Sequence, residues 1–336
     1  MFSLLLGISW GGQAYSWRSY KVITTIVIGA VGRICFIFYE HLSKAKQPLM
    51  PLYLFKNRNY VVLSLCASVA TAMFYGLNII WPQQISALYA GSGKSGAWMA
   101  CTLTAGVIFG QALGSLLVKR IGKTKWQLVV ACCILTAFSS GMAGITEKTK
   151  GMAIAFSCIS STMIGYLDII CLAGAILEVD AKDIGLASGV AFTFRTALSS
   201  LADSIYVSIL ENKIKSNVPK YCIPAALSEG LPKGSLTDLL TAVDNGTASS
   251  AEAVPGMTPS ILAAVSKGLL VAYEKSFQMI YFAAISFGLV AIISAGLSSN
   301  VDSKLTTEIA RKLQGFRQAS DKIDEAKGGS IELERQ

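Results

Sequence analysis

Ionisable side chains inside apolar segments mark the places where this sequence could do chemistry. The segment 185–210 is apolar and rich in small residues, yet it contains Arg195 and Asp203, and the apolar segment 152–177 contains Asp168. A charge deep in a bilayer costs several kcal/mol and persists mainly where it faces a cavity or a partner. We therefore take these three residues as candidates for substrate binding or proton coupling.

Helix geometry predicts how the three candidates are arranged. With a rise of about 1.5 Å per residue, Asp168 and Arg195 lie roughly 3 to 6 Å to the same side of their span centres, so they can meet across adjacent antiparallel helices. Asp203 lies about 12 Å from Arg195 along the axis and about 80° around it, so both can line one broad cavity wall. The alternative is a packing ion pair between Asp168 and Arg195 that has no role in transport.

A second group of polar and aromatic residues lies near the predicted outer end of another apolar segment. Tyr75, Asn78, Trp81 and Gln84 offer the aromatic and amide contacts that an amphipathic substrate would need. The same residues also fit an interfacial aromatic belt, so both interpretations stay open.

Other kinds of chemistry find no support in the sequence. The sequence has one histidine, His41, whereas His-box oxygenases, bis-His haem proteins and zinc proteases need several histidine ligands. There is no Gly-x-Ser-x-Gly elbow and no Gly-x-x-x-x-Gly-Lys-Ser/Thr phosphate loop. We expect no enzyme activity, no cofactor and no metal site. The functions that remain open are transport, a channel, and packing against another membrane protein.

The composition requires a membrane around these residues. Of 336 residues, 53% are hydrophobic and 15% are charged, which is too apolar for an ordinary water-soluble domain. The net charge of +9 lies mainly in loops and the tail, so it predicts topology rather than nucleic-acid binding. Continuously apolar runs favour helices over strands. Seven predicted spans cover 22–39, 60–81, 96–118, 126–146, 152–177, 185–210 and 277–298.

Loop charges predict the orientation of these spans. If the loop 41–58 is cytosolic, most of the loop lysines and arginines fall on the cytosolic side. The loop 211–276 is then outside, and the tail 299–336 is cytosolic. The only glycosylation sequon begins at Asn245 in that outer loop, which makes Asn245 a candidate glycosylation site. Residues 1–10 are expected to be the end of a truncated span.

Small residues predict one close helix contact. Gly106, Gly110 and Gly114 repeat every four residues in the span 96–118 and form a stripe on one helix face. We expect tight helix packing there rather than ligand binding.

Several motifs carry a resemblance to a known family. The stretches "LLLGISWGGQAYSWRSYKVI", "FYEH" and "QPLMPLYLFKNRNY" resemble the region from span seven to the start of span nine in the fourteen-span drug:proton antiporters of the major facilitator superfamily. "LNIIWPQQISALY", "GLPKGSL", "VPGMTPSI" and "SSNVDSKLTTEIARKLQ" resemble more specifically the fungal trichothecene efflux pump branch. The resemblance runs along nearly the whole chain.

The resemblance implies a fold and a set of roles. It implies an all-α integral membrane protein whose residues 60–298 form the C-terminal six-helix bundle of a major facilitator transporter, with 22–39 as an inserted helix. By resemblance, Arg195 is the residue expected to matter most within the helices. "GSLLVKRIGKTK" is similar to the charged hinge-loop motif, with Arg120, Gly122 and Lys123 in register. Lys119 replaces the usual aspartate, which puts the helix-locking charge pair in doubt. The alternative is that the four basic residues of this loop only keep it on the cytosolic side of the membrane.

The expected function is the C-terminal half of a proton-coupled exporter of hydrophobic toxins or drugs in a fungal plasma membrane. Alternating access depends on two bundles, so we expect no transport without an N-terminal half. The expected partners are the lipid bilayer, an amphipathic small molecule, protons and that half. A siderophore transporter of the same fold is the nearest alternative. A truncated, transport-inactive membrane protein is another.

Overall fold

The computed structural model describes residues 18–42, 52–89, 93–180, 183–244 and 255–302, together with a few single residues before Arg18. Within these ranges the chain is helical. Its elements are α2 (Tyr20–Leu42), η1 (Leu52–Lys56), α3 (Arg58–Leu88), α4 (Gly93–Ile121), α5 (Thr124–Gly141), η2 (Met142–Gly144), α6 (Lys150–Leu177), α7 (Ile184–Ser228), η3 (Lys233–Ser235), α8 (Leu236–Asp244) and α10 (Pro259–Leu297).

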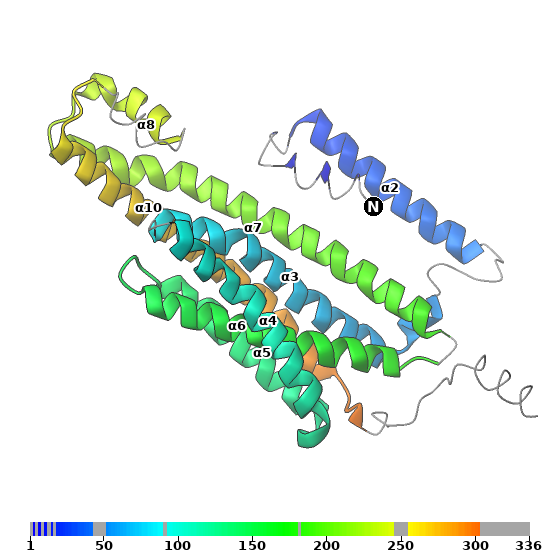
Figure 1. The fold of residues 1–336 in the computed structure, drawn as a ribbon. Coiled ribbons are helices and arrows are strands. Elements are labelled where there is room, and N and C mark those ends of the chain that lie inside the picture. The colour runs from blue at the N-terminus through cyan, green and yellow to red at the C-terminus, as the bar shows by residue number, and fades with distance from the viewer. Residues whose placement is uncertain are drawn as a thin grey trace, which may run out of the picture.

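Six of the described helices are each long and apolar enough to cross a membrane: α3, α4, α5, α6, α7 and α10. They correspond to the six spans predicted for 60–298 and form a bundle in which α3 packs against α6, α7 and α10 (Figure 1). The predicted span 22–39 lies within α2, which runs beside α7 in Figure 1. The protein is therefore an all-α, multi-pass membrane protein.

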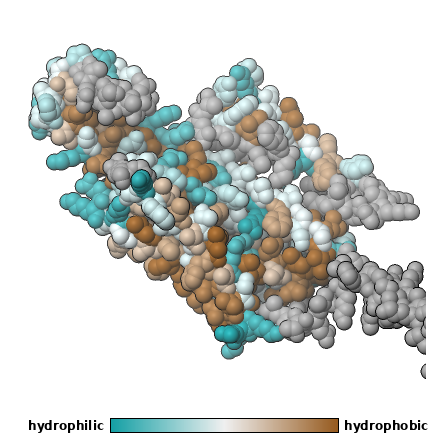
Figure 2. Space-filling view, viewed as in Figure 1, coloured by the Kyte–Doolittle hydropathy of each residue, from teal (hydrophilic) through white to brown (hydrophobic). Residues whose placement is uncertain are grey.

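Burial differs between the helices. Of the six, α3 and α6 are the most enclosed, whereas α4 and α7 are the least. Trp98, Ile108, Phe109 and Leu116 of α4 are exposed apolar side chains. Figure 2 shows such apolar side chains spread over the middle of the bundle, with polar side chains gathered toward its ends. This pattern is the one that a lipid-facing surface requires.

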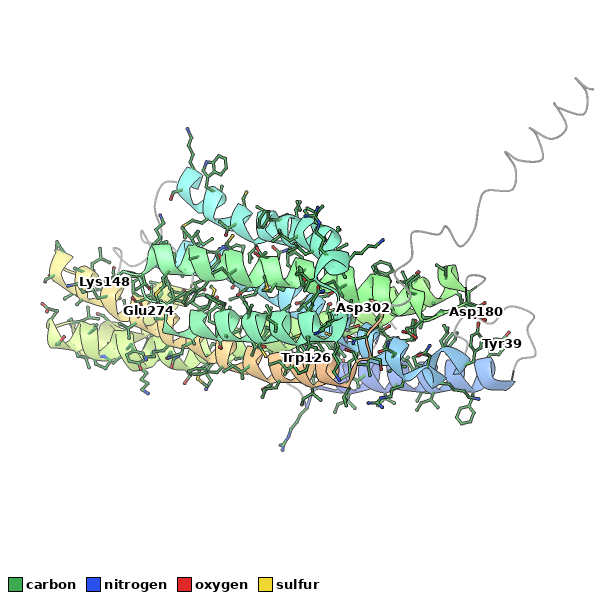
Figure 3. The ribbon with its side chains drawn as sticks, turned by 90° about the horizontal axis from the view of Figure 1, so that it is seen from below. Tyr39, Trp126, Lys148, Asp180, Glu274 and Asp302 are labelled. Carbon is green, nitrogen blue, oxygen red and sulfur yellow. The ribbon has the colours of Figure 1, made fainter. Side chains whose placement is uncertain are left out.

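The connecting segments sort to two ends. Figure 3 shows Lys148 and Glu274 toward one end, and Asp180 and Asp302 toward the other. We call the second the inner end, because its loops are the ones predicted to be cytosolic, and the first the outer end. At the outer end, Glu274 accepts a hydrogen bond from the backbone N–H of Glu147 at 2.7 Å.

Tyr89 closes the outer end of α3. Its hydroxyl donates to the carbonyl of Thr146 at 3.0 Å. Burial, with a smaller contribution from the Glu274 carboxylate, raises the pKa of Tyr89 to about 12. The phenol therefore stays protonated at neutral pH and keeps its donor.

The described part of the predicted outer loop 211–276 is largely helical. The helix α7 continues past 210 to Ser228, and α10 begins at Pro259 rather than at 277. At about 1.5 Å per residue, the 45 residues of α7 extend for roughly 68 Å, about twice the thickness of the hydrocarbon core. The predicted span ends at 210 because hydropathy detects only the part of a helix that lies in lipid. Residues such as Lys213 and Lys220 continue the helix in water, where lysine is a good helix former.

The two helix extensions have small cores of their own. Ala226 and Leu231 pack with Leu239 of α8 and with Ile261 and Val265 of α10. Figure 1 shows α8 at the far end of the hairpin that α7 and α10 form. The outer region is thus a short packed hairpin, joined to the bundle by continuous helices.

The other predicted boundaries need smaller corrections. The helix α3 continues through Pro82 to Leu88, beyond the predicted end at 81. Asn245, most of 1–10, and residues 303–336 of the predicted tail lie outside the described residues.

The glycine stripe packs as predicted. A Cβ atom placed on Gly106 would overlap the side chain of Ser161, and one on Gly110 would overlap the carbonyl of Thr162, both in α6. In return, a Cβ on Gly165 of α6 would overlap the carbonyl of Val107. The helices α4 and α6 therefore meet backbone to backbone, which only small residues permit.

Candidate functional site

The central feature of the site is the ion pair between Arg195 and Asp168. The guanidinium of Arg195 on α7 contacts Oδ1 of Asp168 on α6. Asp168 is only 8% exposed, and the side chain of Arg195 is 21% exposed. The predicted meeting of these two residues across neighbouring helices is confirmed; whether the pair takes part in transport is a separate question.

A third residue joins the pair. Gln111 on α4 donates from Nε2 to Oδ2 of Asp168 at 3.3 Å. The close contact of α4 with α6 explains this reach, because Gln111 directly follows Gly110 and Asp168 lies one turn beyond Gly165. Sequence reasoning missed Gln111. Its place beside the glycine stripe was the available signal.

The trio is charged, hydrogen-bonded and drawn from three helices. The ring of Phe192 also lies 5.7 Å from the guanidinium carbon of Arg195, within the range of a cation–π contact. Such a site can hold a polar group of a ligand if the ion pair opens, and it can remain neutral overall when closed.

Asp203 lies further along α7 than Arg195 and, unlike Asp168, does not contact the Arg195 guanidinium. Its Oδ1 atom is buried and has no hydrogen-bond partner among the described residues, and the same holds for the hydroxyl of Tyr206. The ring of Tyr206 packs against Gly76 of α3 and lies 5.4 Å from the ring of Phe287. Asp203 is thus a half-buried carboxyl group whose Oδ1 atom lacks the ion-pair contact that Asp168 makes with Arg195.

The four predicted residues of α3 separate into two pairs. Trp81 is fully buried and donates from Nε1 to the carbonyl of Met99 at 3.0 Å. Gln84 is 1% exposed and accepts a hydrogen bond from the hydroxyl of Tyr281. Tyr75 and Asn78 are exposed. The structure therefore places Trp81 and Gln84 in the core and leaves only Tyr75 and Asn78 accessible.

The hinge turn between α4 and α5 has an unusual backbone. Gly122 and Lys123 both adopt positive φ, of 64° and 50°. Gln127 donates from Nε2 to the carbonyl of Gly122 at 2.6 Å, and its Oε1 accepts from the hydroxyl of Tyr166 at 2.5 Å. Arg120 and the side chain of Lys123 are exposed, so the motif residues shape this turn through the backbone of Gly122 and Lys123.

A carboxylate does reach this turn, from a distant part of the chain. Asp302, which follows α10, accepts from the backbone N–H of Lys123 at 2.6 Å and from that of Thr124 at 3.1 Å. An anion at the N-terminus of α5 is favoured by the unpaired N–H groups and by the helix dipole. Asp302 therefore brings a carboxylate to the turn that holds the predicted hinge-loop motif.

Further polar contacts connect three helices at the inner end. Asn59 of α3 donates to Oε1 of Glu178 at 2.8 Å and accepts from the backbone N–H of Ser299 at 2.8 Å. Asn57 donates to the carbonyl of Glu178 at 2.8 Å. Together with Asp302, these contacts tie the end of α10 to α3, α5 and α6.

Within the described ranges, no group of three histidine, cysteine or acidic side chains could hold a metal ion. Cys66 and Cys132 lie 3.8 Å apart, sulfur to sulfur, inside the bundle. Both belong to its packed core.

Comparisons with known proteins identify the family of this chain. A family model described as fungal trichothecene efflux pump matches residues 1–332. The chain is 31% identical over 271 residues to the trichothecene efflux pump TRI12 of Fusarium sporotrichioides, covering 79% of this chain and 45% of that protein. It is 29% identical over 271 residues to the MFS-type transporter prx5 of Penicillium rubens, covering 79% of this chain and 49% of that protein.

A solved structure also matches. The bacterial homologue of the human lysosomal transporter Spinster aligns at 16% identity with a TM-score of 0.46, over 86% of this chain and 62% of that one. The chain spans about half the length of the two curated relatives described above.

Proposed function

The chain belongs to the fungal trichothecene efflux pump family, and from that premise we propose that it is the C-terminal part of a proton-coupled exporter of hydrophobic toxins or drugs. It would act in the plasma membrane, together with an N-terminal transporter half that supplies the second bundle. The observation that carries the proposal is the trio of Gln111, Asp168 and Arg195. Polar groups from three helices of an apolar bundle suit a substrate pathway better than they suit packing alone.

The proposal gives the polar residues different roles. Asp203 is the better proton carrier, because its Oδ1 atom has no hydrogen-bond partner among the described residues and can gain and lose a proton without breaking the Asp168–Arg195 ion pair. Asp168 is held by Arg195 and Gln111, so it would respond when a substrate competes for the guanidinium. Tyr75 and Asn78 are accessible on α3 and offer an aromatic face and an amide to an amphipathic molecule.

Alternating access gives the N-terminal half its place in the proposal. In this kind of transporter, two bundles rock against each other around a central site. A single six-helix bundle has no counterpart to rock against, so the chain alone should not export.

The first test concerns the size of the native protein. A tag at the C-terminus, read on a membrane blot, gives a band far above 35.7 kDa if the N-terminal half is on the same polypeptide. A band near 35.7 kDa instead directs the search to a separate half.

The second test measures export. Yeast cells that express the native full-size protein, or the chain with its separate half, should lose a preloaded radiolabelled trichothecene, and a protonophore should abolish that loss. Asp203→Asn should reduce gradient-driven export at normal surface abundance. Asp238→Asn, an exposed acid on α8, is the matched control.

Four results would contradict the proposal or a part of it. Export at the full rate by the chain alone would remove the need for a second half. Protonophore-insensitive export would remove the proton coupling, and full export by Asp203→Asn would remove the role of Asp203 as proton carrier. No export by the complete, surface-expressed protein would remove the function itself.

A further inference from the structure

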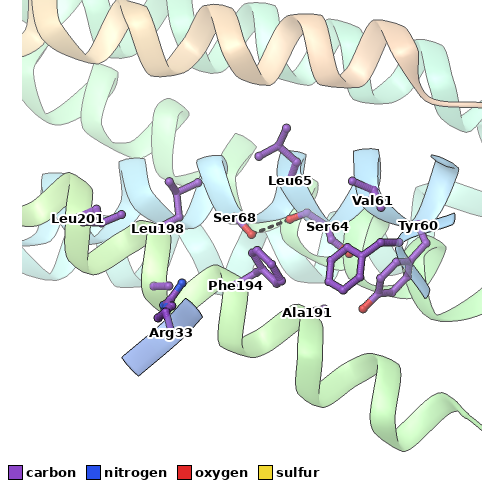
Figure 4. A pocket seen from close by; sticks show the side chains of 12 residues that line it. Arg33, Tyr60, Val61, Ser64, Leu65, Ser68, Ala191, Phe194, Leu198 and Leu201 are labelled. Carbon is purple, nitrogen blue, oxygen red and sulfur yellow. Dashed lines mark hydrogen bonds between the residues drawn. The ribbon is translucent and has the colours of Figure 1, made fainter. Parts of the chain in front are cut away.

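A cavity of about 350 Å³ lies on the inner half of the bundle between α2, α3 and α7. Its walls are mainly apolar and include Phe55, Val61, Leu65, Phe194 and Leu198 (Figure 4). This volume lies within the usual range of small-molecule sites, about 300 to 1,000 Å³. The trio of Gln111, Asp168 and Arg195 is not part of its lining.

One cation enters this cavity. Arg33 of α2 is the only charged residue among the twelve that line it, and it forms no ion pair with any described residue. Arg33 lies about 4 Å from the centre of the predicted span 22–39. A guanidinium does not lose its proton in a protein, so this charge cannot be removed by deprotonation. An arginine at that depth therefore needs an anion, and the described residues supply none.

The polar groups on the opposite wall are mostly occupied. The Tyr60 hydroxyl donates to the carbonyl of Ala187 at 2.8 Å, and the Ser68 hydroxyl donates to the carbonyl of Ser64 at 2.6 Å. The hydroxyl of Ser64 itself is buried and has no hydrogen-bond partner in the described parts of the chain. Figure 4 shows Ser64 on α3 and Arg33 on the stretch of α2 in view, so donors approach from two helices.

From this arrangement we infer that the cavity binds an amphipathic anion, a long apolar body that ends in one anionic group. The guanidinium of Arg33 takes the anionic head, the Ser64 hydroxyl adds a second donor, and the aromatic and leucine walls take the apolar body. The lining has no carboxylate, so nothing in it favours a cation. The inference does not depend on export, since a bound anion here needs no second bundle.

The chemistry admits two sources of the anion. A free hydrophobic carboxylate can enter from the membrane, or an anionic phospholipid can place its head group beside Arg33. Both present the same features to the cavity. A binding experiment can separate them.

The test uses the full 336-residue chain in phosphatidylcholine nanodiscs with radiolabelled oleate as the probe. Oleate should bind saturably, and Arg33→Gln should weaken binding about tenfold or more, as expected for the loss of a charge-assisted hydrogen bond. Methyl oleate has the same apolar body without the charge and should compete poorly. Arg58→Gln, an exposed arginine at the start of α3 outside the cavity lining, is the matched control and should bind oleate like the wild type.

Native mass spectrometry of the chain purified from cells identifies the source. A phospholipid adduct carried by the wild type and lost from Arg33→Gln indicates a membrane lipid. Oleate binding without a retained phospholipid indicates a free acid.

Two results would overturn the inference. One is equal oleate affinity of folded Arg33→Gln and the wild type, and the other is competition by methyl oleate as strong as that by oleate. If Arg33→Gln does not fold, the methyl oleate comparison on the wild type still decides. Ser64→Ala then gives a second, smaller expected loss of about two- to fivefold.

Discussion

Two regions between helices of this protein are built in opposite ways: one is a close contact and the other is a cavity. Between α4 and α6, Gly106, Gly110 and Gly165 leave no room for a Cβ atom, and the backbones touch. Where α2 lies beside the inner halves of α3 and α7, Phe194, Leu198 and Tyr60 border the cavity. Small residues close the α4–α6 contact, whereas a hollow lined mainly by apolar side chains lies between α2 and the packed pair of α3 and α7.

The closed contact also positions chemistry. Because α4 lies so near α6, the amide of Gln111 reaches Asp168, whose other oxygen holds Arg195. In the cavity between α2, α3 and α7, Arg33 has no ion-pair partner among the described residues. One region therefore satisfies its charges internally, and the other leaves a charge for a ligand.

The largest expected effect comes from forcing the closed contact apart. Gly110→Leu places a side chain where the carbonyl of Thr162 lies, so we expect a loss of at least about 3 kcal/mol of stability and little monodisperse protein. Gly189→Ala on α7 meets nothing within 4 Å and is the control. Size-exclusion profiles of fluorescent fusions in detergent measure both. A normal profile for Gly110→Leu would mean that α4 and α6 do not touch.

The second effect comes from removing one charge of the closed region. Arg195→Ala leaves Asp168 buried without its cation, and we expect a loss of about 3 kcal/mol. Adding Asp168→Asn should restore a large part of that loss, because the uncompensated charge is then gone. Thermal unfolding of the single and double variants in nanodiscs tests this. Strictly additive losses would show that the two side chains do not interact.

A smaller effect is expected at the inner end, where α10 meets the hinge turn. Asp302→Asn weakens the cap on α5 by about 1 kcal/mol, since an amide oxygen is a poorer acceptor than a carboxylate at a helix N-terminus. Hydrogen exchange of the amides of residues 123 to 127 should become faster, while the exchange in α6 stays unchanged. Unaltered exchange at the turn would show that Asp302 does not cap it.

The smallest effect on stability is expected from filling the open region. Ala197 lines the cavity, so Ala197→Leu should change stability by less than about 1 kcal/mol, because existing space receives the added atoms. The same change should weaken oleate binding severalfold. If stability falls as far as it does in Gly110→Leu, the region between α2, α3 and α7 is as closed as the α4–α6 contact, and the comparison fails.

Several features could be predicted from the sequence because they depend on local properties. Apolar length indicated the membrane and the six helices of the bundle, and a spacing of four residues indicated the glycine contact. The depth of Asp168 and Arg195 along their helices predicted that they could meet. Each of these follows from the rise and the period of a helix, together with the solvent around it.

The remaining features were decided by the tertiary structure. The accessible part of α3 could not be chosen from Tyr75, Asn78, Trp81 and Gln84, because burial depends on which neighbours cover each face. The carboxylate at the hinge turn is supplied by Asp302, far along the chain, and no spacing rule relates it to Gly122. The sequence by itself determined the helices, their solvent and which charges must find partners. Only the packing of those helices decided which partner each charge found, because such contacts join residues whose separation in sequence carries no geometric information.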